Sequence, residues 1–185
     1  MIKQNDQTKL LLSETIKKLM VNTPLEKLTV TDIVKEAGLT RQTFYRHFRD
    51  KYDLVNWRFD SLAQQCFYKM GVSLTLRDGL ILKFNFIRNE KNFFMQAFRS
   101  KDYNSIEQHD YEFILKFYTE IIEKQLQRPL PENLRFILEL YCHGSITMTV
   151  EWAVNGMEKS SETMADDLID SLPPKLAQIL LPVLR

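Results

Sequence analysis

Apolar residues recur along most of the chain at the three- and four-residue spacing of amphipathic helices, and no stretch alternates as a strand would. A polar arm, residues 1–5, is expected to be disordered. Prolines, glycines and polar clusters separate the apolar segments, as they do between helices. The predicted helices span residues 6–21, 31–37, 41–48, 50–70, 76–88, 91–98, 106–127, 132–157, 161–172 and 175–184. The pattern therefore predicts an all-α protein with nine or ten helices.

The stretch from Thr29 to Leu54 predicts two short helices joined by a tight turn. Thr31 can cap the first helix through its hydroxyl group. Gly38 stands where a helix ends in a left-handed residue, a conformation that glycine adopts at least cost. Thr40 is placed to cap the second helix. A short helix, a turn with glycine and a second helix make up the helix-turn-helix pattern, whose second helix lies in the DNA major groove.

The second of these helices, residues 41–48, has one apolar and one polar face. Phe44 and Phe48, four positions apart, are predicted to lie in the core. The polar face consists of Arg41, Gln42, Thr43, Arg46 and His47. On these residues alone, the polar face can equally be a solvated surface above an apolar stripe.

Charge is distributed unevenly along the chain, although the net charge is only +1. Residues 1–60 carry 11 Lys and Arg against 8 Asp and Glu, and the remainder carries 14 against 16. Four basic residues and one acidic residue lie between Arg41 and Lys51. A local basic patch on a nearly neutral chain is expected of a DNA-binding head.

The segment LTRQTFYRHFRDKYDL resembles the signature of the TetR family of bacterial transcription regulators. The residues that match this signature are Leu39, Thr40, Tyr45, His47, Phe48 and Lys51. The resemblance extends over about residues 10–54. Gln42 and Arg46 depart from it, because a smaller residue and an aromatic residue often occupy these positions. The resemblance to the TetR family implies a three-helix DNA-binding head followed by a helical body.

The predicted DNA contacts fall into two groups, because base contacts specify a sequence whereas phosphate contacts position the protein. Arg41 can donate two hydrogen bonds to guanine, Gln42 can pair with adenine, and Thr43 can meet a thymine methyl group. The resemblance assigns phosphate contacts to Tyr45 and His47, and Arg46 is either a further phosphate contact or merely exposed. The predicted phosphate-contacting residues are Thr29, Thr31, Thr40, Tyr45, Arg46, His47 and Lys51.

Two helices of the body, residues 132–157 and 161–172, carry apolar stripes with small residues between large ones. The resemblance implies that these helices pair with their twins in a four-helix interface of a homodimer. The predicted interface residues are Leu138, Tyr141, Ser145, Met148, Trp152, Met164 and Leu168. The alternative is that these stripes pack only within one chain.

Aromatic residues of the body can line a ligand pocket or simply form the core. The candidate pocket residues are Phe84, Phe98, Phe113, Phe117 and Tyr141. The segment EWAVNGMEKSSETMADDL is similar to TetR-like regulators of dihydroxyacetone-kinase operons. That similarity implies a signal from a partner protein instead of a small-molecule effector.

Other chemistry is not supported by the sequence. It contains no Gly-rich phosphate loop, GxSxG or HExxH, so we expect no enzyme activity and no cofactor. Cys66 and Cys142 lie far apart without a Cys/His cluster, which favours a reduced cytoplasmic protein without a metal site. Glu139 and His143 are four residues apart, and His143 is expected to be a buried or interface residue instead of half a metal site. No apolar run suffices for a membrane span.

Together these patterns predict a helix-turn-helix DNA-binding domain at residues 1–50 and an effector-sensing, dimerisation domain at residues 51–185. The predicted function is sequence-specific regulation of transcription. The homodimer would bind a palindromic operator on double-stranded DNA, with its affinity controlled by an effector that acts on the body. The alternative is an interaction module whose body docks a partner protein while DNA serves as a scaffold.

Overall fold

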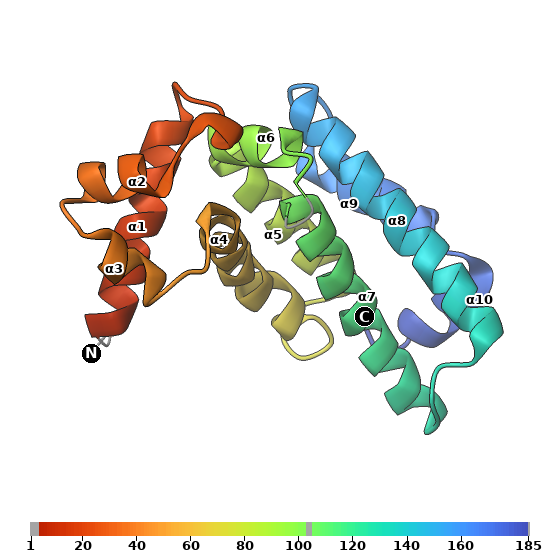
Figure 1. Cartoon of the computed structure of the whole chain (residues 1–185). Helices are drawn as coiled ribbons and strands as arrows, with labels where there is room; N and C mark the ends of the chain where they lie inside the picture. Colours follow the sequence, from red (N-terminus) through yellow and green to blue (C-terminus); the bar gives the residue numbers. More distant parts are fainter. Residues whose placement is uncertain (1–3, 103–104, 185) are drawn as a thin grey trace.

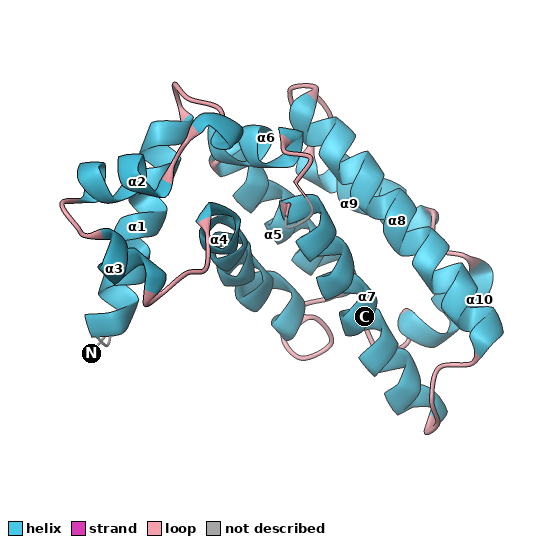
Figure 2. Cartoon of the chain, in the orientation of Figure 1, coloured by secondary structure: helices cyan, strands magenta, loops and turns pink. Residues whose placement is uncertain are grey.

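The computed structural model describes residues 4–102 and 105–184, and within these ranges it contains helices and no strand (Figure 2). Ten α-helices and two short 3₁₀ turns confirm the all-α prediction and the expected number of helices. The first helix already includes residues 4 and 5, so this part of the predicted arm is wrong. Residues 1–3 of that arm, and residues 103–104 between the predicted helices 91–98 and 106–127, lie outside the described ranges.

Three helices at the N-terminal end form a head, on the left of Figure 1. Helix α1 (Gln4–Met20) fully buries Leu12, Ile16 and Met20, which lie four residues apart on one face. This face packs against α2 (Val30–Ala37) and the helix that leaves the head. The first apolar stripe of the sequence therefore becomes the core of the head.

The N-cap of helix α2 lies two residues earlier than the sequence suggested. Thr29, not Thr31, is the N-cap: its hydroxyl group accepts a hydrogen bond of 3.2 Å from the Asp32 amide. The Asp32 carboxylate accepts the Thr29 amide in return, at 2.9 Å. This reciprocal pair is a capping box, and it places Thr31 inside the first turn. Gly38 ends the helix with φ 67°, as predicted.

The second helix of the motif, α3 (Arg41–Tyr45), is shorter than the predicted 41–48. The chain then continues as a turn, in which the Phe48 amide donates to the Phe44 carbonyl at 3.0 Å. Phe44 and Phe48 are both buried, which confirms their predicted place in the core. These two rings hold the helix against the head, while its other face points to solvent.

Helix α4 (Lys51–Cys66) leads from the head into the body and passes through the middle of the molecule in Figure 1. Asp50 caps it by accepting hydrogen bonds of 2.8 Å from the amides of Tyr52 and Asp53. The helix gives way to a 3₁₀ turn, η2 (Phe67–Lys69), so it ends earlier than predicted.

Six helices form the body. They are α5 (Leu76–Asn89), α6 (Lys91–Arg99), α7 (Ile106–Leu126), α8 (Glu132–Val154), α9 (Ser161–Asp170) and α10 (Pro174–Leu180). Helix α8 packs against α6 and α7, and α9 packs against α5. Figure 1 shows α10 at the end of the body that is remote from α3.

One ion pair lies entirely inside the body. The Lys83 ammonium on α5 donates to both carboxylate oxygens of Asp110 on α7, at 3.1 and 2.8 Å. The exposed fractions of the two side chains are 3% and 0%. The ammonium also lies 6.0 and 5.5 Å from the ring centroids of Phe59 and Phe67. Because a buried charge is costly without its partner, each residue of the pair constrains the other.

Asp110→Ala is expected to lower the free energy of unfolding by about 3–5 kcal/mol, because it leaves the Lys83 charge buried and unpaired. Glu120→Ala is the control, since Glu120 forms an exposed pair with Lys116 on the same helix and its removal should change little. Urea unfolding measures both. A double substitution, Lys83→Met with Asp110→Leu, should recover most of the loss. Equal stabilities of Asp110→Ala and Glu120→Ala would contradict this account.

Candidate nucleic-acid interface and its connection to the body

The N-terminal turn of α3 is built by threonine hydroxyl groups. Thr40 caps the helix by accepting the Thr43 amide at 3.1 Å, and the two hydroxyl oxygens lie 3.0 Å apart. Arg46, one turn further on, donates to the Thr43 hydroxyl at 3.3 Å. The predicted cap at Thr40 is confirmed. Its oxygen is occupied in holding the helix, so its contact with a phosphate stays a prediction.

Arg41 and Gln42 project from the first turn of α3 into solvent. Arg41 lies along its own helix, where Nη2 donates to the Tyr45 hydroxyl at 3.4 Å and the guanidinium lies 5.8 Å from the ring centroid. Tyr45 is itself half exposed. Thr43 is only partly exposed, because Thr40 and Arg46 cover its hydroxyl. Arg41 and Gln42 are therefore the better placed of the three predicted base readers.

His47 lies beside the recognition helix, partly buried against Phe48 at a ring-centroid distance of 6.4 Å. Burial lowers the pKa of His47 below its ordinary value of 6.5, and the positive charges of Lys9 and Arg46 lower it further. The imidazole is therefore mainly neutral at pH 7. A neutral ring can still donate one N–H to a phosphate oxygen.

Thr29 and Thr31, at the start of α2, differ in whether their hydroxyl groups are free to bind a DNA phosphate. The Thr29 hydroxyl donates to the Asp32 carboxylate at 2.6 Å and accepts the Asp32 amide, so it is committed to the cap. A carboxylate beside it also disfavours an approaching phosphate. Thr31, by contrast, is exposed in the first turn. Of the two, Thr31 is the better phosphate candidate.

Lys51 is tied into the fold. Its ammonium donates to the carbonyls of Glu26 and Leu28 at 2.8 and 2.9 Å, at the segment that contains the short turn η1 (Leu25–Lys27). Partial burial lowers the pKa of Lys51. Two of its three N–H donors are thus used inside the head, and one remains for a phosphate. Lys51 therefore anchors the start of α4 to the segment that contains η1.

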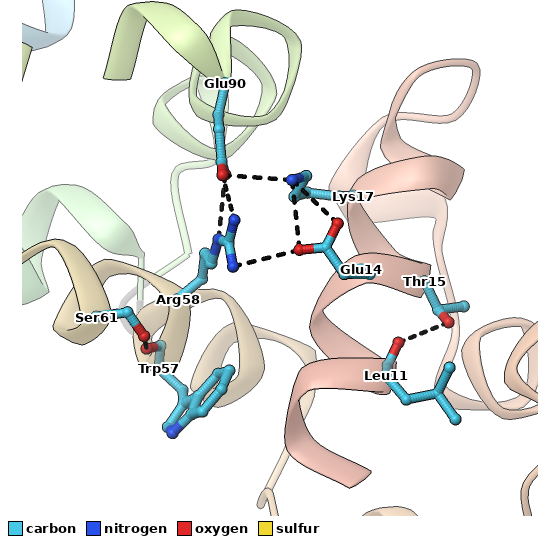
Figure 3. Close-up of polar contacts among 8 residues, drawn as sticks. All are labelled: Leu11, Glu14, Thr15, Lys17, Trp57, Arg58, Ser61 and Glu90. Carbon is cyan, nitrogen blue, oxygen red and sulfur yellow. Dashed lines mark hydrogen bonds and ion pairs between the residues drawn. The ribbon is translucent and has the colours of Figure 1, made fainter. Parts of the chain in front are cut away.

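A network of four charged side chains joins the head to the body (Figure 3). Arg58 of α4 forms a bidentate ion pair with Glu90, which lies at the corner between α5 and α6. Glu90 Oε1 also accepts from Lys17 of α1 at 3.3 Å. Glu14 of α1 completes the ring, 3.3 Å from Arg58 and 3.1 Å from Lys17.

The Arg58–Glu90 pair within this network is well shielded, whereas Glu14 is exposed. The exposed fractions of Arg58 and Glu90 are only 15% and 14%, so water screens their attraction weakly. The Arg58 guanidinium also lies 5.7 Å from the ring centroid of Phe86 on α5. Beside the network, a polar cleft of about 390 Å³ separates α1 from the start of α6. Helices α1, α4, α5 and α6 thus meet in a single charged contact.

The predicted dimer residues do not share one exposed face. Leu138, Tyr141, Ser145 and Trp152 on α8, with Met164 and Leu168 on α9, are buried within the chain, and of the seven only Met148 is exposed. Helix α8 packs against α6 and α7 through the face that was assigned to a partner. The Tyr141 hydroxyl donates to the Leu168 carbonyl at 2.9 Å, which ties α8 to α9.

A different face of α8 is apolar and exposed. Phe136, Leu140 and Met148 have exposed fractions of 68%, 64% and 52% and follow one another at intervals of four and then eight residues. A groove of about 500 Å³ lies along this face between α8 and the end of α9. His143 lies on this groove, exposed and stacked on Tyr111 at a centroid distance of 3.9 Å. Of its two predicted settings, burial within the chain is therefore wrong, and a place in an interface stays a prediction.

The predicted pocket residues are packing residues. Phe84 and Phe98 are fully buried, and Phe84 meets Trp152 edge to face at 5.2 Å. Phe113 and Phe117 both pack on Phe67. None of these four phenylalanines lines any of five surface cavities found among the described residues. Tyr141 lines the groove between α8 and α9.

Two observations bear on other kinds of site. In the part of the chain that the structure describes, no group of His, Cys, Asp and Glu side chains has the arrangement needed for a metal ion. None of the helices described is both long and apolar enough to cross a bilayer.

Comparison with known proteins defines the class. The family description "Transcriptional regulator C-terminal region" matches residues 75–173, more than half of the chain. The description "Bacterial regulatory proteins, tetR family" matches residues 13–56. The chain therefore belongs to the tetR family and is a DNA-binding transcription regulator. Proteins of this family are regulators and generally not enzymes.

Similar individual proteins include the dhaKLM operon transcriptional activator DhaS of Lactococcus lactis subsp. lactis (strain IL1403). It is 23% identical over 97 residues, which are 52% of this chain and 52% of DhaS. The match thus spans about half the length of that relative.

Solved structures extend the likeness of the fold over nearly the whole chain. A structure of the dihydroxyacetone kinase operon activator DhaS has a TM-score of 0.64 at 21% identity and covers 93% of this chain and 96% of its own. FadR from Bacillus subtilis, in complex with stearoyl-CoA, has a TM-score of 0.59 at 17% identity and covers 88% and 96%. At these identities the likeness concerns the fold alone.

Sequence reasoning missed the residues that connect the head and the body. Arg58 and Glu90 lie 32 positions apart, and Lys17 and Glu90 lie 73 apart, so no local spacing reveals these pairs. The exposed stripe of Phe136, Leu140 and Met148 was visible only as part of a helix that is apolar on several faces.

Lys51→Met should lower the free energy of unfolding by about 1–3 kcal/mol, since it removes two charge-assisted hydrogen bonds and leaves two carbonyls without a donor. Lys27→Met, at an exposed neighbouring position, is the matched control and should have little effect. Urea unfolding followed by circular dichroism measures both. If Lys51→Met keeps wild-type stability and only weakens binding to DNA, the anchoring role assigned here is wrong.

Proposed function

We propose that the protein is a homodimeric regulator in which residues 1–50 read a two-fold symmetric operator and residues 51–185 dimerise and receive a signal. The observation that carries the proposal is the capped recognition helix, which presents Arg41 and Gln42 to solvent. Within the described ranges, neither Arg41 nor Arg46 forms an ion pair with a carboxylate. Their charges therefore remain available to nucleic acid.

The exposed stripe on α8 supports the homodimer. A two-fold interface is self-complementary, and a helix that presents Phe136, Leu140 and Met148 can pair with its own copy. Gly144, between them, leaves space for close approach because nothing lies within 4 Å of its missing side chain. Two heads joined in this way would meet successive major grooves on one side of the operator.

Regulation would act through α4. A signal that moves the corner between α5 and α6 would displace Glu90, and the charged network would carry the displacement to Arg58 and α1. Because α4 leads directly into the head, such a displacement changes the separation of the two recognition helices. An effector acts in this way only through its different affinity for the two arrangements.

A partner protein is the second candidate for the source of the signal. Phe84 and Phe98 fill the centre of the body as core residues, and the buried Lys83–Asp110 pair lies among aromatic rings there. A body filled in this manner favours a signal that arrives at its surface. Stable complex formation with a partner that alters operator binding would support this second candidate.

Selection of bound sequences from a random DNA pool tests the main proposal. We expect a two-fold symmetric consensus at near-physiological salt, where phosphate-driven affinity no longer hides base preference. Arg41→Ala should then relax the preference at one base position of each half-site by about 1–3 kcal/mol. Arg128→Ala, at an exposed position of the body, is the control. A folded dimer that enriches no sequence would overturn the proposal.

Glu90→Gln tests the coupling between head and body. Insertion of one base pair between the half-sites should weaken wild-type binding, because the network holds the heads at a fixed separation. Coupling energies of this kind are typically about 1–3 kcal/mol, so the penalty should fall by roughly tenfold in the variant. Glu120→Gln, in the exposed pair on α7, should keep the full penalty. An unchanged penalty in Glu90→Gln would show that the network does not set the separation.

A further inference from the structure

Lys9 lies at the DNA-binding end of the head, although it precedes the helix-turn-helix by more than 20 residues. Its ammonium is 5.8 Å from the ring centroid of Phe48 and 5.9 Å from that of Trp57. The two rings are 6.0 Å apart, one from the turn after α3 and the other from α4. Cation–π attraction to this aromatic platform restricts where the half-buried Lys9 can reach.

His47 touches the same platform. Its ring lies 6.4 Å from the Phe48 ring, the ring that also lies beneath the Lys9 ammonium. The charged groups that act on His47 are Lys9 from α1 and Arg46 from its own segment. From α4, the contact with the platform is made by the uncharged Trp57. The surroundings of His47 are therefore positive on two sides.

Lys9 and Arg46 differ from other cations of the head in the carboxylate partners that the structure describes for them. Lys17 and Lys18, further along α1, pair with Glu90 and Glu36. Among the side chains of residues 7–102 and 105–184, no carboxylate forms such a pair with Lys9 or Arg46. Positive charges that repel one another without a counter-charge are a cost to the free protein. An anion placed between them removes that cost.

We propose that Lys9 and His47 bind one phosphate of the DNA backbone between them, and that His47 takes up a proton from solvent on binding. In the bound state the imidazolium donates one N–H to a phosphate oxygen, and the Lys9 ammonium donates to the same phosphate. Lys9 thereby becomes a phosphate-contacting residue outside the helix-turn-helix. The inference rests on the proposed function in one respect, namely that the head binds DNA.

The sign of the pH dependence follows from the two states. In the free protein the pKa of His47 lies below 6.5, because of burial and the charges of Lys9 and Arg46. A bound phosphate raises that pKa by favouring the charged ring. Between the two pKa values each head gains a proton on binding, so operator affinity rises as the pH falls through this window.

The experiment measures operator affinity of the full-length protein as a function of salt and of pH. Each phosphate contact contributes about 0.9 to the slope of log K against log salt, so Lys9→Gln should flatten the slope by about 1.8 for two heads. Lys9→Met keeps the apolar stem on the aromatic platform and should flatten it equally, whereas Lys9→Arg should restore it. Lys175→Gln, an exposed lysine of α10, is the control.

The pH profile separates a phosphate contact from a merely structural role. Removal of the Lys9 charge should move the His47 window to higher pH, and His47→Gln should abolish the pH dependence. A wild-type slope and an unmoved window in both Lys9→Gln and Lys9→Met would overturn the inference while leaving the proposed function intact. If the wild-type protein selects no operator at all, it is the proposed function that fails.

Discussion

The burial of Phe44 is the contact on which the DNA-binding surface depends. Helix α3 has only five residues, and an isolated helix of that length does not form in water. Burial of the Phe44 and Phe48 rings stabilises the short helix, and the Thr40 hydroxyl satisfies one of its free amides. Because the inner rings fix its rotation, Arg41 and Gln42 must face outward. The polar face of the helix is therefore oriented by its apolar face.

The local structure of the helix-turn-helix could be predicted from the sequence. The turn at Gly38, the cap at Thr40 and the buried pair of phenylalanines are each specified by residues within four positions of one another. The cap of α2 was placed two residues too late, because Thr29 and Thr31 are both plausible caps by residue type. The reciprocal bond from Asp32, three residues after Thr29, decides between them.

Most of the predicted dimer residues are buried within the chain, and the reason is tertiary. Helix α8 carries apolar residues on more than one face, so periodicity alone did not show which face meets the rest of the chain. The structure assigns Leu138 and Trp152 to contacts within the chain, and leaves Leu140 and Phe136 in solvent. The candidate pocket phenylalanines pack as core residues, and the sequence could not show this because aromatic spacing is the same for a filled core as for a lined cavity.

Charges in this protein fall into two sets with different consequences. Lys83 and Arg58 are buried or half-buried and have carboxylate partners, because an unpaired charge at those depths would oppose folding. Lys9, Arg41 and Arg46 lie around the recognition helix and have no such partner among the side chains of residues 7–102 and 105–184. Folding therefore pairs the cations of the first set with carboxylates. It leaves the cations of the second set to repel one another. The repulsion is small in water, and a bound anion such as a DNA phosphate would relieve it. Under the proposed function, DNA would therefore stabilise the protein at the surface that the recognition helix presents to it.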